Sequence, residues 1–275
     1  MRKQKVSRNI ITILTACLLI IYLSPLYLLF TIALKTNEDF SKNNFGLPKH
    51  IMWQNLIDAM KDMDYFKSFL SSLVIAVGAI FLILILASMA SYALARRSKR
   101  IYSFLYIFFL SGMMIPFQLT MLPLYKFINT IHLMGTHLGV ILLYVASYLP
   151  IAIVILTGFM KTIPRDLDEA AAIDGASPFY IFLHIILPLV KPPLTTVMIF
   201  SVVGIWNDLL TPMLFLGSKS PTLIVNLYNF VGAFYRTNWT MVFAGSIVTM
   251  LPLLILFLVC QRYFIEGMVA GAVKG

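Results

Sequence analysis

The sequence predicts an all-α protein that crosses a membrane several times. Of its 275 residues, 60% are hydrophobic and only 12% are charged, whereas soluble domains contain about 45–50% apolar and about 25% charged residues. The mean hydropathy is +0.90. The apolar residues also gather in long runs, and about 20 of them in a row let a helix cross the hydrocarbon core of a bilayer. These observations predict a polytopic membrane protein with six transmembrane helices.

Each apolar run of sufficient length is expected to form one membrane-spanning helix. The spans are predicted at residues 10–34, 69–95, 102–125, 137–159, 193–216 and 241–264. The first run follows MRKQKVSR, which resembles the basic region of a signal peptide. The run is too long for a signal peptide and no small-residue cleavage site closes it, so we expect a retained anchor. Residues 1–275 are expected to form a single transmembrane domain.

The distribution of basic residues predicts the orientation in the membrane, because Lys and Arg are concentrated in short cytoplasmic loops. The residues that decide it are Arg2, Lys3, Lys5 and Arg8 in the amino-terminal tail, and Arg96, Arg97, Lys99 and Arg100 after the second span. With six spans, both termini and segment 160–192 are expected in the cytoplasm, and segments 35–68 and 217–240 outside. The formal charge of +10 then follows from topology, so lipid is the expected surrounding and no nucleic-acid partner is predicted.

The segment KTIPRDLDEAAAIDGASP predicts a short helix with a sharp end. Pro164 suits a first helical turn, and Gly175 is a typical helix stop. The acidic residues near the start, where the helix dipole favours negative charge, are Asp166, Asp168 and Glu169.

A second helix is predicted to begin directly afterwards, with Ser177 as its cap and Pro178 at its first position. Its apolar residues are spaced as one helical stripe and are Phe179, Phe182, Leu183 and Ile186. Two interpretations of this helix pair remain open. Its alanine run leaves a narrow surface that fits a groove in a protein partner, or the two helices only cover the bundle, as helix-bearing loops of this length often do.

A longer stretch, EAAAIDGASPFYIFLHIILPLVKPP, resembles the Glu-Ala-Ala (EAA) signature of permease subunits of bacterial ABC importers. The matching positions are Glu169, Ala170, Ala171, Asp174, Gly175, Ala176, Phe179, Leu187 and Pro188. Three further stretches are similar to the carbohydrate-uptake subgroup, which includes the smaller membrane subunit of the maltose importer. They are MMIPFQLTMLPLY at 113–125, IWNDLLTPMLFL at 205–216 and QRYFIEGMVAGAVKG at 261–275.

The resemblance implies a type I ABC importer permease fold and the role of a transport subunit, not an enzyme. It implies a second permease subunit, ATP-binding cassette subunits and an extracytoplasmic sugar-binding protein as partners, in a bacterial inner membrane. The implied contacts with the ATPase are Glu169, Ala170, Ala171, Asp174, Gly175 and Ala176. The carboxyl tail GMVAGAVKG is also expected to reach toward the ATPase. The sequence contains no G-x-x-x-x-G-K-[ST] motif, which agrees with ATP hydrolysis in a separate subunit.

Polar residues inside the fifth span require a polar surrounding, because an acid at the centre of a membrane helix costs roughly 2.5–3.5 kcal/mol. In one interpretation Trp206, Asn207 and Asp208, together with Gln118 of the third span, line the sugar path. In the other, which we favour, Asn207 and Asp208 bond neighbouring helices or fix a kink before Pro212.

Weaker candidates for the path are Tyr144, Ser147 and Tyr148. No catalytic residues, metal ligands or cofactors are predicted. The four His residues are scattered, and Cys17 and Cys260 lie singly in apolar runs.

Other functional classes explain less of the sequence. A proton-coupled secondary carrier would use Asp208 as its proton site but would give the EAA segment no purpose. An intramembrane enzyme would need a catalytic constellation within the spans. An ABC permease for a solute other than a sugar is the main alternative.

Overall fold

A computed structural model describes residues 2–217, 220–231 and 237–272, with side chains described from residue 11 to residue 259 and at residue 261 within these ranges. All regular elements among these residues are helices, so the predicted all-α class is confirmed. The chain divides into two compact units. One comprises Met1–Phe66 and Asn226–Pro252, and the other comprises Lys67–Val225 and Leu253–Gly275.

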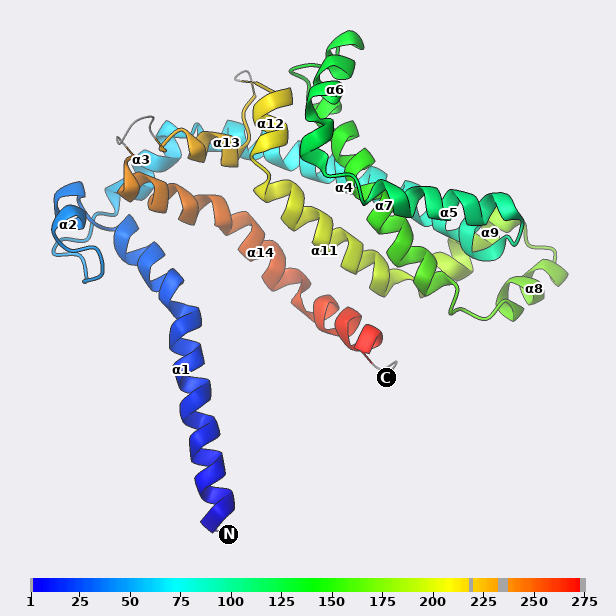
Figure 1. Cartoon of the computed structure of the whole chain (residues 1–275), viewed down its shortest axis with the longest axis horizontal. Coiled ribbons are helices and arrows are strands. Elements are labelled where there is room, and N and C mark those ends of the chain that lie inside the picture. Colours follow the sequence, from blue (N-terminus) through cyan, green and yellow to red (C-terminus); the bar gives the residue numbers. More distant parts are fainter. Residues whose placement is uncertain (1, 218–219, 232–236, 273–275) are drawn as a thin grey trace. The chain divides into compact units, whose positions relative to one another are not determined.

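Four continuous stretches of helix are long and apolar enough to cross a membrane. They lie in α1 (Arg2–Ala33), α4 (Tyr65–Arg96), α7 (His137–Met160) and α14 (Trp239–Ala272). These correspond to the first, second, fourth and sixth predicted spans (Figure 1). Two further pairs of helices reach the required length only when each bent pair is taken as one span.

The third predicted span, at residues 102–125, is strongly bent beside Pro116, a residue type that typically interrupts a helix. Helices α5 (Arg100–Gly112) and α6 (Phe117–Thr130) meet at 100°. Pro116 lies at the break with an extended backbone, at ψ 126°. Proline has no amide hydrogen and disfavours the helical conformation in the residue before it, which explains why the helix does not continue through this position.

The fifth predicted span is also interrupted. Helix α11 (Lys191–Asn207) is bent by 74° from the preceding segment Pro178–Leu189. It ends at Asp208, and a separate short helix, α12 (Leu210–Phe215), follows. The fifth predicted span, at residues 193–216, is therefore interrupted at Asp208, in agreement with the interpretation of a kink before Pro212.

The first unit contains α1, α2 (Asn37–Lys42), α3 (Gln54–Asp62) and the first part of α14. The side chain of Lys35 is fully buried, and its Nζ donates to the Asn43 carbonyl at 2.6 Å. This bond satisfies the buried ammonium group within the loop that follows α1. The apolar core of the unit consists of Ala33, Ala59, Met241, Ala244 and Ile247.

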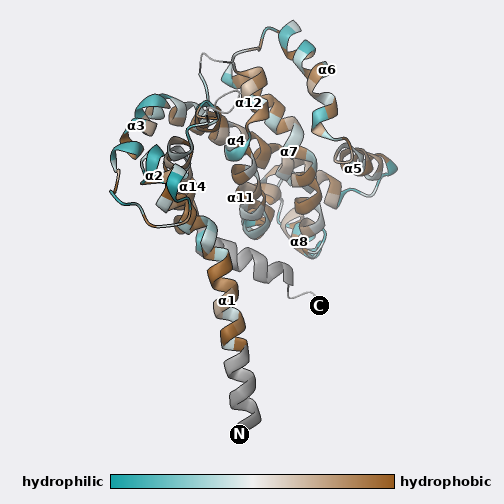
Figure 2. Ribbon diagram, turned by 60° about the vertical axis from the view of Figure 1, so that its left-hand side comes forward, coloured by the Kyte–Doolittle hydropathy of each residue, from teal (hydrophilic) through white to brown (hydrophobic). Residues whose placement is uncertain are grey.

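The second unit is built around α7, which packs against α5, α11 and α12. Figures 1 and 2 both show α7 beside α11, and Figure 2 shows the apolar character of these helices. Helix α4 buries mainly small residues, among them Ala76, Ala79, Ala87 and Ser91. Small residues allow helices in a membrane to approach closely, and the Ser91 hydroxyl donates to the Ile153 carbonyl of α7 at 3.2 Å.

Enlarging a buried small residue of α4 should therefore destabilise the protein. Ala79 is fully buried, whereas Val77 on the same helix is 59% exposed. We expect Ala79→Leu to lower stability by about 1–3 kcal/mol because the site is already filled, and Val77→Leu to have little effect. Thermal unfolding of the purified protein in detergent measures both. Equal melting temperatures for the two variants would contradict the packing described here.

Candidate functional site

The EAA segment forms α8 (Asp166–Ile173), a tight turn and α9 (Pro178–Ile181). Gly175 has a φ of +83°, a conformation that suits glycine. The Ala176 amide donates to the Ala171 carbonyl at 2.9 Å, and the Gly175 amide donates to the Ala172 carbonyl at 3.1 Å. This pair of bonds is a Schellman motif, so the predicted helix stop at Gly175 is confirmed.

The start of α9 also agrees with the prediction. Ser177 accepts a hydrogen bond from the Tyr180 amide at 3.3 Å, and Pro178 is the first helical residue. The side-chain oxygen of Ser177 thereby satisfies one of the amides that have no partner within the helix. The predicted cap is confirmed.

The start of α8 differs from the prediction, because Pro164 precedes the helix instead of lying in its first turn. The amides of Asp168 and Glu169 donate to the Arg165 carbonyl at 2.9 and 3.0 Å. The first turn therefore begins at Asp166, and the acidic residues lie within it as predicted.

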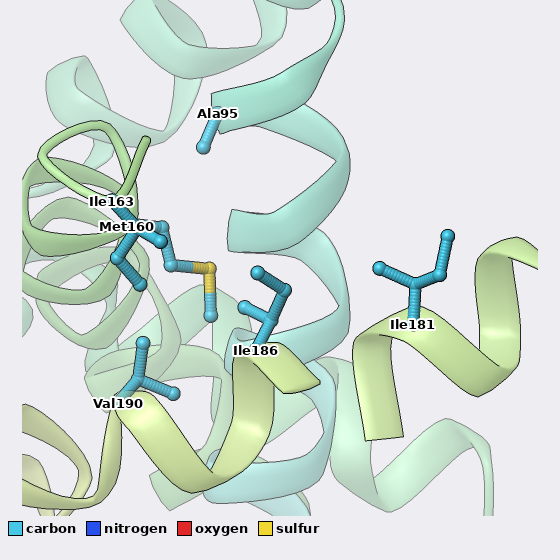
Figure 3. Close-up of a cluster of buried hydrophobic side chains, with 6 residues drawn as sticks. All are labelled: Ala95, Met160, Ile163, Ile181, Ile186 and Val190. Carbon is cyan, nitrogen blue, oxygen red and sulfur yellow. The ribbon is translucent and has the colours of Figure 1, made fainter. Parts of the chain in front are cut away.

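The predicted apolar stripe of the second helix is wrong, because the chain passes into a π-helix, η1 (Phe182–Ile186), before α10 (Leu187–Leu189). A π-turn has more residues than an α-turn, so the buried positions shift along the chain. Phe182 and Ile186 are buried, whereas Phe179 is 64% and Leu183 is 41% exposed. The cluster drawn in Figure 3 consists of Ala95, Met160, Ile163, Ile181, Ile186 and Val190.

The residues of the EAA segment separate into an inner and an outer group. Ala171 and Ala176 are partly buried and pack against the cluster of Figure 3. Glu169, Ala170 and Ile173 are exposed, and their helical spacing places them together on a surface that we call the outer face of α8.

The outer face of α8 carries a large apolar side chain. Ile173 is 86% exposed, and Asp174 and Gly175 are exposed beside it in the turn. The outer face of α8 therefore presents apolar surface next to the carboxylate of Glu169.

A partly buried ionic network attaches α8 to the helix bundle. Arg96 Nη2 lies 2.8 Å from Asp168 Oδ2, and Arg96 Nε donates to Asp168 Oδ1 at 3.2 Å. The Tyr92 hydroxyl donates to the same Oδ1 at 3.0 Å. Arg96 Nη1 donates to the carbonyls of Ile163 and Met160 at 2.9 and 3.3 Å. We call the three linked side chains the Tyr92–Arg96–Asp168 network.

Sequence reasoning did not find this network. It treated Arg96 only as a marker of orientation and Asp168 only as an acid near a helix start. The two residues are 72 positions apart, so no local spacing connects them. The one available signal was a charge of each sign at the same predicted side of the membrane.

Trp206, Asn207 and Gln118 have different surroundings in the structure. Trp206 is buried, and its ring lies 6.1 Å from that of Phe69 on α4. Asn207 is exposed, and its side-chain amide donates to the Val203 carbonyl at 2.8 Å. Gln118 is exposed in the first turn of α6.

Asp208 lies at the break after α11 and is bonded on both sides. Its Oδ2 accepts from the Tyr144 hydroxyl at 3.0 Å, and its Oδ1 accepts from the Leu210 amide at 3.0 Å. The carboxylate thus provides an acceptor for the Leu210 amide, at a point where helical backbone bonding stops, and for the Tyr144 hydroxyl. This geometry agrees with the interpretation in which Asp208 fixes a break and bonds a neighbouring helix.

A cavity of about 480 Å³ lies beside the break between α5 and α6. The rings of Tyr148 and Phe200 in its wall are 6.0 Å apart. The Tyr148 hydroxyl lies against Gly204, where an added Cβ atom would overlap it. The described lining also includes Thr120 and Ser147, and it does not include Gln118 or residues 206–208.

Among the described residues, no group of three or more His, Cys, Asp or Glu side chains could hold a metal ion. Cys17 is exposed and free. The side chain of Cys260 and those of the tail GMVAGAVKG lie outside the described residues, as does the whole of residues 273–275.

The chain matches known membrane transport proteins along its length. The model of the family described as binding-protein-dependent transport system inner membrane component matches residues 84–269. The chain is 36% identical over 271 residues to the melibiose/raffinose/stachyose import permease protein MelC of Bacillus subtilis (strain 168), with 98% of each chain covered. It is 34% identical over 275 residues to the probable starch degradation products transport system permease protein AmyC of Thermoanaerobacterium thermosulfurigenes, with 100% of each covered.

A solved chain from a bacterial ABC transporter involved in the import of the acidic polysaccharide alginate has a TM-score of 0.80 to this structure. The two chains are 20% identical, and the match covers 96% of this chain and 98% of the other. The likeness shows that they share a fold, which confirms the fold that the EAA resemblance implied.

The positive φ of Gly175 leads to a prediction about the turn after α8. Gly175→Ala should destabilise the turn by about 1–2 kcal/mol, because a Cβ atom disfavours the left-handed conformation. Gly158→Ala is the matched control, since Gly158 is helical and nothing lies within 4 Å of an added Cβ there. Hydrogen exchange of peptides covering residues 166–181 should accelerate only in the Gly175 variant. Unchanged exchange would show that the turn does not require this conformation.

Proposed function

The chain belongs to the family of inner membrane components of binding-protein-dependent transport systems, and we propose that it forms half of the translocation path of an ATP-driven importer of sugars. Membership of this family makes it a transport subunit and not an enzyme. The match over the full length of two relatives named for sugar transport supports the sugar assignment. In this proposal, residues 1–275 act as one transmembrane domain in a bacterial cell membrane, with both termini in the cytoplasm.

The outer face of α8 is the proposed contact with an ATP-binding cassette subunit. The observation that carries this assignment is the 86% exposure of Ile173, beside the exposed Glu169 and Ala170. An apolar side chain in this position gains stability when a partner removes it from water.

The rest of the EAA segment supports this contact in two ways. Asp174 and Gly175 extend it into the exposed turn. Ala171 and Ala176 pack against the bundle of this chain but are only partly buried, so in this proposal they fix the position of the segment and still contribute to the contact with the ATPase.

The remaining partners are a second permease subunit, which completes the path, and an extracytoplasmic sugar-binding protein, which delivers the substrate.

In the translocation path, the exposed Asn207 and Gln118 are the proposed contacts with sugar hydroxyls. Trp206 and Asp208 support that wall of the path through their contacts with Phe69 and Tyr144.

Transport should depend on ATP and not on a proton gradient. We expect proteoliposomes that contain this chain, its partner permease, the ATPase and the binding protein to accumulate a labelled oligosaccharide when ATP is supplied. Collapsing the proton gradient with an ionophore should leave the rate unchanged while ATP is maintained. Uptake that follows the gradient would identify a carrier, and uptake of only non-sugar solutes would exclude the sugar assignment.

Changing the outer face of α8 should weaken ATPase binding. Glu169→Lys reverses a charge and Ile173→Asp places a charge in the proposed apolar contact, so each should reduce the ATPase recovered with the chain. Asp62→Lys is the control, since Asp62 is exposed at the end of α3 and far from this face in sequence. Affinity purification followed by quantification of the ATPase measures the effect. Full recovery with both outer-face variants would contradict the docking assignment.

A further inference from the structure

We propose that the Tyr92–Arg96–Asp168 network transmits a displacement of α8 to α4 and α7. Arg96 and Asp168 are then positioning residues for ATP-coupled transport, and they act without touching the ATPase or the sugar. This inference rests on the proposed function and adds to it the route by which a displacement of α8 reaches the membrane-spanning helices.

Asp168 attaches α8 to α4. Among the described residues, the side-chain hydrogen bonds and the ion pair that connect α8 to other helices all end on this carboxylate. The Arg96 guanidinium approaches it with two nitrogen atoms, and this two-point arrangement fixes direction as well as distance. Tyr92, one helical turn before Arg96, adds a second donor from the same helix.

Arg96 also binds the end of α7. Its Nη1 donates to the carbonyls of Met160, the last residue of α7, and Ile163, in the turn that follows, where the regular bonding of the helix ends. One guanidinium group therefore connects the end of α4, the end of α7 and the start of α8. Three elements joined through a rigid planar group are expected to move as one body.

The partial burial of the pair makes each charge depend on the other. The side chains of Arg96 and Asp168 are only 11% and 17% exposed. Within the described part of the chain, Arg96 Nη2 and Asp168 Oδ2 have no hydrogen-bond partner apart from the ion pair that they form with each other. Removing one partner would leave the other charge poorly solvated, so the arrangement depends on both.

The other attachments of α8 resist displacement less. Ala171 and Ala176 contact the apolar cluster through single methyl groups. On the carboxyl side, α8 continues through the Gly175 turn, the π-helix η1 and the 74° bend before α11. Each of these departs from a straight helix. A push on α8 is therefore transmitted more directly to α4 and α7 than to α11.

Transport per ATP hydrolysed tests the proposal. In reconstituted complexes, Asp168→Asn and Arg96→Met should retain the ATPase but lower the sugar transported per ATP by roughly tenfold, in the range of coupling effects between sites. Asp62→Asn and Arg100→Met are matched controls that remove the same charges, because both residues are exposed and no side-chain partner of either is seen among the described residues. Both controls should keep the wild-type ratio.

Milder variants keep the test informative if Arg96→Met does not fold. Tyr92→Phe removes one of the bonds to Asp168, and Arg96→Lys keeps the charge but loses the two-point contact. Both should lower the transport ratio less than Asp168→Asn does. A wild-type ratio in Asp168→Asn and Arg96→Lys would overturn the proposal, and so would loss of the ATPase from these variants, because the network would then serve docking.

A distance measurement separates positioning from general stability. With Cys17 and Cys260 replaced by Ser, spin labels at the exposed positions Ala172 on α8 and Met89 on α4 should give one narrow distance distribution with and without ATP. Asp168→Asn should broaden it. An equally narrow distribution in that variant would contradict the claim that the network fixes the position of α8 relative to α4. Failure of the unmodified complex to bind the ATPase would instead refute the proposed function.

Discussion

Backbone hydrogen bonding is the constraint on which the rest of this structure depends. Inside lipid no water can satisfy a free amide or carbonyl group, so a spanning segment must be helical or must supply partners where the helix stops. The chain meets this requirement at Asp208, whose carboxylate accepts from the Leu210 amide beyond the break and from the Tyr144 hydroxyl of α7. A polar residue in an apolar span thus has a structural use before any transport role is considered.

The same requirement explains the position of the Tyr92–Arg96–Asp168 network. Arg96 donates to the carbonyl of Met160, the last residue of α7, and to that of Ile163 in the turn that follows. Its remaining donors are directed at Asp168. The satisfaction of a helix end and the attachment of α8 therefore depend on one side chain, which connects local backbone chemistry to the proposed transmission of movement.

The sequence predicted those features that depend on local chemistry. The all-α class, four of the spans, the helix stop at Gly175 and the cap at Ser177 were recognisable because each depends on composition or on a few neighbouring residues. The prolines near the bends of the third and fifth spans indicate that the helices are interrupted there, but the bend angles depend on packing, and hydropathy reports only apolar length. The π-helix at Phe182–Ile186 shifts the buried face of the second short helix, and no residue pattern predicts a π-helix there. The pairing of Arg96 with Asp168 required the fold itself.

The turn at Gly175 has a consequence for how that position can be substituted. Apart from its two neighbours in the sequence, no described residue lies within 4 Å of a Cβ atom placed at Gly175, although φ is +83°. The restriction within this chain is therefore one of handedness and not of volume. A D-amino acid, whose preferred backbone angles are the mirror image of those of natural residues, would fit the turn without strain where L-alanine would not.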